Sequence, residues 1–350
     1  MTTGSKSARF PPQGRTVAVF GATGHTGRFV VAELLRRGLA PVAVGRNGKS
    51  LAALGFADRG IATRTATTDH PASLDRAFAG VAAVINCAGP FLDTADAVAA
   101  AAIRSRIHYL DITAEQASAQ ATLDKHDAAT REAGRLVIPA MGFFGGLVDL
   151  LATAAMGDWD RADDIRVGIW LDSWHPTQGT RITGERNTAR RLVISSGRLV
   201  PIPQPAPESS WRFPAPFGDQ DVVEVALSEA ILIAHHVHVA ELHTYLGRRS
   251  LQDLRDPTTP PPKPADASGR SAQIFMTDVV ATKDGGTRRA IAQGRDIYAF
   301  SAPLVVEAVR RILEGEVRAS GAHAPGAIFD ARAFLHALAP ELISLEITAS

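Results

Sequence analysis

Residues 17–27 of this 350-residue chain read Val17-Ala18-Val19-Phe20-Gly21-Ala22-Thr23-Gly24-His25-Thr26-Gly27. A short apolar run ends here in a glycine-rich turn, and residues 28–37 follow with the apolar spacing of a helix. Strand, tight turn and helix in this order form the front of a dinucleotide-binding unit. The alternative interpretation is a glycine-rich turn in some other α/β protein.

Each glycine in this turn has a physical role. Gly21 lets the chain leave the strand sharply, and Gly27 lets the helix pack close to that strand. Gly24 has no side chain, so the backbone there can approach a pyrophosphate, which the N–H groups and the positive dipole end of the helix would face. The spacing is G-x-x-G-x-x-G rather than the older G-x-G-x-x-G. The residues predicted to bind the cofactor here are Gly21, Thr23, Gly24, His25, Thr26 and Gly27.

The end of the second predicted strand, residues 41–44, indicates which cofactor binds. An NAD enzyme usually places Asp or Glu about 20 residues past the turn, where it binds the ribose 2′-OH. No acid occurs between Glu33 and Asp58, and Arg46 stands in this position. A guanidinium can pair with a 2′-phosphate through two hydrogen bonds and stack on the adenine. We therefore predict NADP(H), with Asn47 beside the phosphate; the alternative is a solvated turn arginine.

Strand-like and helix-like stretches alternate up to about residue 146, which predicts a Rossmann doubly wound parallel sheet. Asp69 follows the third predicted strand, residues 61–67, and is placed to reach the adenine amino group. A buried strand at residues 81–86 runs into a turn of small residues, where the ribose and nicotinamide should lie. The predicted contacts in this turn are Cys87, Ala88, Gly89 and Pro90. We interpret Cys87 as a packing residue rather than a nucleophile, because no basic partner lies near it in the sequence.

The composition is that of an ordinary soluble globular protein long enough for two domains, with 45% hydrophobic and 21% charged residues. The formal net charge of +1 gives no reason to expect nucleic acid or an anionic membrane as a partner. No apolar run approaches the ~20 residues that cross a bilayer. The polar residues 1–13 are predicted to be a disordered lead without a signal core. The single cysteine rules out an internal disulfide and indicates a reducing cytoplasm.

The second half of the chain predicts an antiparallel sheet with a few helices. Residues 165–171 alternate like a strand with one buried face, and a helix is predicted at about residues 180–195. Residues 274–282 and 287–293 are two strands joined across Asp284-Gly285-Gly286, a strong hairpin signal. Residues 201–216 and 257–269 are proline-rich and are predicted to be irregular loops.

The last stretch predicts two helices, at residues 302–313 with Pro303 near the start, and at residues 330–338. The expected organisation is therefore a disordered lead at 1–13, an NADP-binding domain at 14–150, an α+β substrate and dimerisation domain at 151–300, and C-terminal helices at 301–350.

Candidate catalytic residues are few. The Tyr-x-x-x-Lys pair of short-chain dehydrogenases is absent, which removes the usual tyrosine acid. Asp111 and Glu115 lie at the carboxyl end of a predicted strand, and His175 lies on a loop beside Trp174. We predict these three as catalytic or substrate-contacting residues. The alternative for the two acids is helix capping, because acids favour the first turn of a helix.

A histidine cluster in the second domain raises the question of a metal. Spacing on a predicted strand puts His236 and His238 on one face, with His235 and His243 nearby. No carboxylate–histidine pattern typical of a zinc site accompanies them, so a solvated strand face is the preferred interpretation and no metal is predicted.

With these stretches assembled, the chain resembles the saccharopine dehydrogenase-like NADP-binding oxidoreductases, a group that includes trans-acting enoyl reductases. The resemblance covers nearly the whole chain; it lies in the glycine turn, Gly45-Arg46-Asn47, Asn86-Cys87-Ala88-Gly89-Pro90-Phe91, Tyr109-Leu110-Asp111-Ile112-Thr113-Ala114-Glu115 and Gly294-Arg295-Asp296-Ile297-Tyr298. Two places depart from the family's pattern. The family often has glycine where this chain has Ala114, and it often has proline where this chain has Gly145-Gly146-Leu147. The resemblance implies that the second-domain sheet also forms a homodimer and that the C-terminal helices pack back on the first domain.

These observations predict an NADPH-dependent reductase that transfers hydride to a small or medium organic acceptor with an activated C=C, C=N or C=O bond. The scarcity of acid–base residues favours an enoyl or imine acceptor. The alternative is a non-catalytic NADP(H)-binding regulator, and a structural scaffold is a more distant one.

Overall fold

The first domain is built on a parallel sheet, sheet A. The computed structural model describes residues 14–349, and the predicted lead at residues 1–13 lies outside them. Sheet A has seven strands in the order β15-β6-β5-β4-β1-β2-β3, and every pairing in it is parallel. Its strands are β1 (Thr16–Phe20), β2 (Ala40–Gly45), β3 (Ala62–Thr65), β4 (Ala83–Asn86), β5 (His108–Asp111), β6 (Leu136–Ile138) and β15 (Gly321–Ala322). The strand order reverses at β1 and β4, so a ligand crevice is expected at their carboxyl ends.

Helices cover both faces of sheet A. Alternate residues of β1 point to opposite faces of the sheet, and they pack into two different cores. Val17 and Val19 pack into one core with α1 and α10, whereas Ala18 and Phe20 pack into another with α3, α4 and α5. The helices are α1 (His25–Arg36), α2 (Gly48–Ala53), η1 (Ala57–Arg59), α3 (Pro71–Phe78), α4 (Phe91–Arg104), α5 (Gln116–Ala133) and α10 (Ile297–Leu313). The predicted doubly wound parallel sheet is confirmed.

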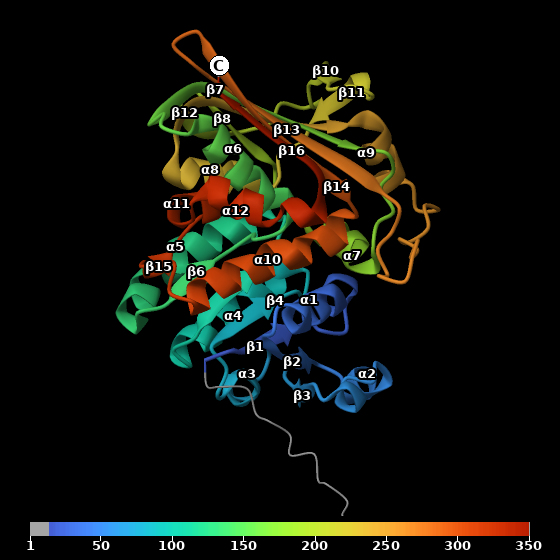
Figure 1. Cartoon of the computed structure of the whole chain (residues 1–350), viewed down its shortest axis with the longest axis vertical. Coiled ribbons are helices and arrows are strands. Elements are labelled where there is room, and N and C mark those ends of the chain that lie inside the picture. Colours follow the sequence, from blue (N-terminus) through green and yellow to red (C-terminus); the bar gives the residue numbers. More distant parts are fainter. Residues whose placement is uncertain (1–13, 350) are drawn as a thin grey trace, which may run out of the picture.

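The second domain is built on a mixed sheet, sheet B, which Figure 1 shows above sheet A. Its main path is β10-β11-β12-β7-β13-β14-β16, with β8 on β12 and β9 on β8; β7 and β12 are parallel and the other pairs antiparallel. The strands are β7 (Arg161–Leu171), β8 (Leu192–Ser195), β9 (Arg198–Pro201), β10 (Glu208–Phe213), β11 (Gly218–Glu224), β12 (His238–Gly247), β13 (Ile274–Lys283), β14 (Gly286–Arg295) and β16 (Leu342–Ala349). The predicted hairpin is β13–β14, and the mainly antiparallel sheet is confirmed.

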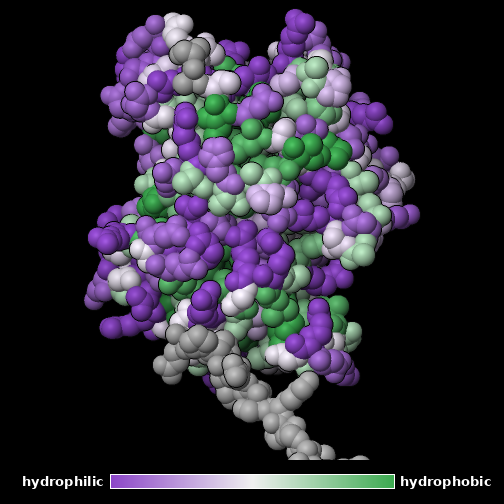
Figure 2. Space-filling view, viewed as in Figure 1, coloured by the Kyte–Doolittle hydropathy of each residue, from purple (hydrophilic) through white to green (hydrophobic). Residues whose placement is uncertain are grey.

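Helices fill the space between the two sheets and flank sheet B. They are the π-helical turn η2 (Phe143–Leu147), α6 (Val148–Met156), α7 (Gln178–Arg186), α8 (Ser228–His236), α9 (Arg248–Arg255), α11 (Pro325–Ile328), α12 (Ala331–Ala337) and η3 (Ala339–Glu341). One hydrophobic core runs from β1 through α6 and α10 to β7 and β13, so the two domains share buried surface. Figure 2 shows hydrophilic residues over most of the face seen in Figure 1, with hydrophobic residues in separate patches in its upper and lower halves.

Two predicted stretches in the second domain are wrong. The helix expected at 180–195 ends at Arg186, and Leu192 begins a strand because the Gln116 side chain binds both its N–H and its C=O, at 2.7 and 2.8 Å. The stretch 201–216, expected to be irregular, contains β10, which pairs along its length with β11. Proline at both ends of β10 leaves the strand itself free to pair.

The histidines expected on one strand lie on different elements. His235 and His236 end α8, and His238 begins β12, so the alternation that placed His236 and His238 together does not exist. His236 Nε2 instead lies 2.7 Å from the buried carboxylate of Asp149. His243 Nδ1 lies 2.5 Å from Glu224. These histidines join neighbouring elements, and no group of three metal-ligating side chains occurs within residues 14–349.

The C-terminal stretch does more than add helices. α10 begins at Ile297, because the Asp296 side chain accepts the N–H groups of Tyr298 and Ala299 at 3.1 and 3.0 Å, so Pro303 lies inside the helix. After α10, β15 adds the edge strand of sheet A and β16 adds the edge strand of sheet B. The expectation of helices alone for 301–350 is therefore wrong, although α10 packs on α1 of the first domain as expected.

A buried carboxylate joins α10 to α1. Glu307 is 1% exposed, accepts hydrogen bonds from Arg310 at 2.9 Å and Arg311 at 2.7 Å, and pairs with Arg37 at the end of α1. Burial would raise the pKa of Glu307, but the hydrogen bonds and charges of these arginines lower it to about 2. The ion pair therefore requires the charged carboxylate.

We predict that Glu307→Gln lowers the free energy of unfolding at pH 7 by about 3 kcal/mol, because it removes the buried carboxylate that Arg37, Arg310 and Arg311 share and leaves them only their outer partners Glu33, Glu314 and Glu316. The pKa of Glu307 is depressed in the folded state, so its contribution is complete above the unfolded value of about 4.3 and is lost as the pH falls toward 2. Urea unfolding at a series of pH values should show the two proteins converging over that range. Glu314→Gln, on the same helix with a side chain 42% exposed, should cost less than about 1 kcal/mol. Equal losses in the two variants would contradict the prediction.

Candidate functional site

The turn between β1 and α1 has room only for glycine at two positions. Gly21 has a φ of +84°, and a Cβ on it would lie 2.8 Å from the backbone nitrogen of Ala88. A Cβ on Gly27 would overlap the carbonyl oxygen of Gly21. The start of α1 therefore packs directly on the backbone of the turn, and the turn packs directly on the backbone of the loop after β4.

The first turn of α1 offers free backbone donors. Gly24 is the exposed N-cap of this 12-residue helix, no side chain caps it, and no acid lies in its first turn. The helix dipole and the uncapped N–H groups favour an anion at this end. Thr23 precedes the cap, and Thr26 reaches the large cavity described below.

His25, the first residue of α1, contains a polar atom that lacks a partner among the described residues. Its ring lies edge-on to Phe29 and to Tyr298, with centroids 5.3 and 5.6 Å away, and Nε2 is buried without a hydrogen bond. Burial lowers the pKa of His25. An orphaned nitrogen beside uncapped helix N–H groups fits a polar, phosphate-bearing ligand.

The residues predicted for the adenosine end lie at the edge of sheet A. Arg46 is exposed directly after β2, and the described residues give it no hydrogen-bond or ion-pair partner. The Asn47 side chain accepts the N–H groups of Lys49 and Ser50 at 2.9 and 3.2 Å, so it caps α2. Asp69 is exposed after β3. Arg46 is therefore available to a 2′-phosphate, while the Asn47 side chain is used to shape the turn.

The loop after β4 is held by hydrogen bonds from both sides. Asn86 Oδ1 accepts the N–H of Ala88 at 3.0 Å, and Thr94 Oγ1 donates to the Ala88 carbonyl at 2.6 Å. Cys87 and Gly89 line the cavity, Pro90 precedes α4, and burial raises the pKa of the Cys87 thiol. A thiol with a raised pKa agrees with a packing role for Cys87.

The two predicted catalytic acids are buried and bound to the backbone. Glu115 lines the cavity, but its two oxygens accept the N–H groups of Phe91 at 2.7 Å and Leu92 at 3.3 Å, at the start of α4. Asp111 is 0% exposed and accepts from Thr113 N–H, Ala140 N–H and the Tyr109 hydroxyl at 2.9, 2.8 and 2.8 Å. Burial raises the pKa of Asp111 to about 6. Both side chains stabilise the loops that form the crevice.

A cavity of about 720 Å³ lies between the two domains at the carboxyl ends of β1, β4 and β5. Its first-domain wall consists of Thr26, Cys87, Gly89, Phe91, Ile112, Ala114 and Glu115. The opposite wall includes Phe143, Phe144, Trp174, Thr177, Thr180, Thr183, Leu227, Leu254 and Tyr298, together with Arg181, Arg191 and Arg255. α7 covers the loop after β4, since a Cβ on Gly89 would lie 3.2 Å from Thr183 Oγ1. This is the crevice expected from the strand order.

Tyr298 lies in this cavity and was missed among the sequence candidates. Its hydroxyl accepts the indole N–H of Trp174 at 2.9 Å and lies 2.9 Å from Thr180 Oγ1. Its ring also contacts His25 in the glycine turn, and burial raises the pKa of the phenol. Its hydrogen-bond partners Trp174 and Thr180 lie more than 100 residues away in the sequence, and the one signal that included Tyr298 was the stretch Gly294–Tyr298 shared with the resembling family.

His175 lies outside this set. Its Nδ1 is 3.1 Å from the carbonyl of Pro260, and it does not line the cavity, whereas its neighbour Trp174 does. Trp174 is 5% exposed and stacks on Phe144 with ring centroids 5.2 Å apart. The structure thus brings Glu115, Cys87 and Tyr298 to one cavity and leaves His175 on an adjoining loop.

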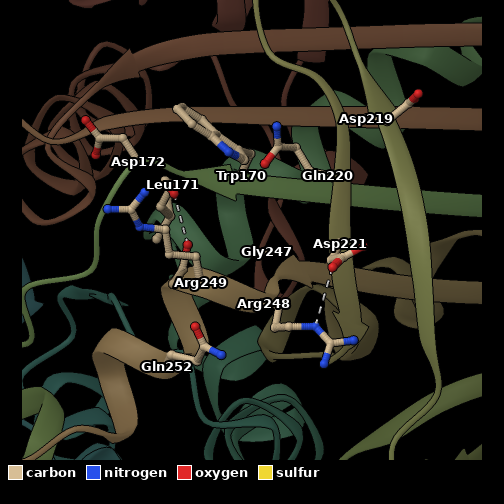
Figure 3. A pocket seen from close by; sticks show the side chains of 11 residues that line it. Trp170, Leu171, Asp172, Asp219, Gln220, Asp221, Gly247, Arg248, Arg249 and Gln252 are labelled. Atoms are coloured by element: carbon tan, nitrogen blue, oxygen red, sulfur yellow. Dashed lines mark hydrogen bonds and ion pairs between the residues drawn. The ribbon is translucent and has the colours of Figure 1, made fainter.

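A second hollow, of about 620 Å³, lies on sheet B away from the first domain (Figure 3). The ends of β7 and β12 and the starts of β11 and α9 form it, and no residue of the first domain lines it. Within it Arg248 pairs with Asp221 at 3.9 Å, and Ser250 donates to the Leu171 carbonyl at 3.0 Å. A cofactor bound at the glycine turn would not reach this hollow, so the interdomain cavity is the candidate site.

The comparisons with known proteins agree with this geometry. Residues 17–138 match the model of the saccharopine dehydrogenase NADP binding domain. A "Probable mitochondrial saccharopine dehydrogenase-like oxidoreductase" of Arabidopsis thaliana is 34% identical over 143 residues, which are 36% of this chain. The match spans 31% of that relative's length. Among residues 14–349, every helix is too short or too polar to span a bilayer.

The fold as a whole also has a solved counterpart. The apo form of saccharopine dehydrogenase (L-Glu forming) from Saccharomyces cerevisiae superposes with a TM-score of 0.68, over 96% of this chain and 100% of that one, at 11% identity. The shared fold includes both sheets, and the family model identifies the cofactor as NADP(H). Residues 17–138 therefore form an NADP-binding domain similar to that of saccharopine dehydrogenases, and the chain as a whole shares the fold of saccharopine dehydrogenase.

Proposed function

We propose that the protein is an NADPH-dependent reductase that transfers hydride to a small or medium organic acceptor with an activated C=C, C=N or C=O bond. The observation that supports this most is the interdomain cavity, which has Thr26, Cys87 and Gly89 of the cofactor side on one wall and aromatic residues on the other. NADPH supplies a hydride when bound. A cavity of this size beside the cofactor turn suits an organic substrate.

The chain's own residues would divide the remaining work. The glycine turn and the N–H groups of α1 bind the pyrophosphate, and Arg46 binds the 2′-phosphate. Glu115 and Asp111 act as positioning residues, because their carboxylates hold the loops of the crevice. The Tyr298 hydroxyl is the proton donor at the substrate, since it lines the cavity and lies 2.9 Å from the Thr180 hydroxyl, through which its proton can be replaced.

A regulatory protein that binds NADP(H) without turnover is the second candidate. The cavity favours it in one respect: both oxygens of Glu115 are already bound to backbone N–H groups. Mixing NADPH-loaded protein with a panel of enoyl, carbonyl and imine acceptors separates the two. An enzyme oxidises NADPH with at least one acceptor, whereas a regulator binds NADP⁺ and NADPH unequally and oxidises nothing.

The assembly and the location are also proposals. A homodimer through sheet B suits the exposed edge strand β16, where Ile343 is 57% exposed. A cytoplasmic location rests on the single cysteine.

We predict that wild-type protein binds NADPH at least ten-fold more tightly than NADH (about 1.4 kcal/mol) and that Arg46→Ala removes this preference. The guanidinium supplies the charge that pairs with the 2′-phosphate, so NADH affinity should not change. Tryptophan fluorescence titration measures both affinities. Arg76→Ala, an exposed arginine on α3, serves as the control and should retain the preference. A wild type without the preference would contradict NADP(H) specificity at Arg46.

Once the acceptor panel gives an assay, Tyr298→Phe should lower kcat by about 100-fold, the usual contribution of a general acid, with NADPH affinity unchanged. His175→Ala should lower kcat less than about two-fold, because its side chain does not line the cavity. Stopped-flow oxidation of NADPH checks both variants. A large loss in His175→Ala together with an active Tyr298→Phe would reverse these roles.

A further inference from the structure

Two arginines in the second-domain wall of the cavity have no role in the reaction proposed above. Arg191 lies just before β8 and Arg255 ends α9, so separate elements bring them to one cavity. Among the described residues, Arg255 has no hydrogen-bond or ion-pair partner. The hydrogen bond described for Arg191 is a single one, from Nη1 to the Ala226 carbonyl at 3.2 Å. Most of their donors therefore remain available.

The third arginine of the cavity has a structural partner. Arg181 donates to the carbonyl oxygens of Asp256 and Thr259 at 3.2 and 2.7 Å, which attaches α7 to the loop after α9. Backbone carbonyl groups that can accept a hydrogen bond from an arginine are thus present close to α9. Arg255 is nevertheless left unpaired there, so its fork of donors is available to a ligand.

Three arginines and two carboxylates, Glu115 and Glu185, line the cavity, and neither carboxylate forms an ion pair with Arg191 or Arg255. Arg191 and Arg255 are both exposed residues at the cavity wall. Partial desolvation lowers the pKa of Arg191, the carboxylate of Glu229 opposes that effect, and the charge of Arg255 adds to it, so the two guanidinium groups act on one another. Glu229 is itself 0% exposed, and burial raises its pKa to about 7. At neutral pH this carboxylate is only partly ionised. Two neighbouring cations with incomplete compensation favour an anion between them.

The surfaces next to these arginines are apolar. Phe144 and Trp174 stack on each other, and Leu227 and Leu254 line the same cavity. Glu115 has both oxygens bound to N–H groups of α4, so it is not available to a substrate ammonium group. The cavity therefore combines an apolar lining with a cationic region.

We propose that the substrate is an amphipathic anion, with an apolar body against Phe144 and Trp174 and a terminal carboxylate or phosphate bound by Arg191 and Arg255. This rests on the proposed function insofar as the cavity is taken as the substrate site. The planar guanidinium forks suit the oxygen pairs of a carboxylate or a phosphate, and an apolar body gains from burial against the stacked rings.

The test is binding of shape-matched probes to NADP⁺-saturated and cofactor-free protein, measured by isothermal titration calorimetry. The probes are 3-phenylpropanoate, its uncharged analogue 3-phenylpropanamide, and 2-phenylethyl phosphate. We expect at least one anion to bind ten-fold or more tightly than the amide, and that preference to disappear in Arg191→Gln and in Arg255→Gln. The tighter of the two anions identifies the head group as carboxylate or phosphate.

Arg249→Gln is the matched control. Arg249 is exposed and lines the separate hollow of Figure 3, so this variant should keep the preference. Thermal unfolding of each variant confirms that it is folded. Equal affinity for anion and amide, no binding of any probe, or a preference that survives in both cavity variants overturns the proposal. A protein that prefers the anions but does not bind NADP⁺ would instead overturn the proposed function and leave the anion site standing.

Discussion

The close contact between Gly27 and the carbonyl of Gly21 determines the position of nearly everything that forms the site. It sets the direction in which α1 leaves the turn, and α1 in turn supports α10, to which the buried Glu307 network joins it. The first turn of α10 then carries Tyr298 back over His25. A side chain at residue 27 would therefore displace the cofactor turn and also α10, the helix that carries Tyr298 to the cavity.

The two walls of the cavity supply different kinds of chemical group. The first domain contributes backbone donors, small residues and carboxylates that are already bound to N–H groups. The opposite wall contributes rings, hydroxyls and guanidinium groups, the guanidinium groups all from the second domain. Substrate preference can thus change through the second domain while the cofactor geometry stays constant. The hydrophobic core that runs through α6 and α10 fixes the positions of the two cavity walls relative to each other.

Local patterns in the sequence predicted the first domain well because its strands and helices alternate with clear periods and glycine stops. The hairpin across Asp284-Gly285-Gly286 follows the predicted bounds closely. Long-range pairing was not readable from the sequence: Leu192 is a strand residue partly because the Gln116 side chain binds its backbone. The position of Asp111 at a strand end correctly indicated the crevice. Its orientation depends on Ala140, a residue of another loop, so the sequence could not show that the carboxylate is buried.

The last strands have a consequence for how the molecule reaches its folded state. Sheet A takes β15 and sheet B takes β16 from residues 321–349, and α10 lies between the sheets just before them. Domains in a chain commonly fold one after another during synthesis, the N-terminal one first. Here neither sheet has its full set of strands until the final segment is present, so the two domains complete their folding as one cooperative unit. The order of the strands along the chain therefore couples the folding of the cofactor-binding half to the folding of the substrate-binding half.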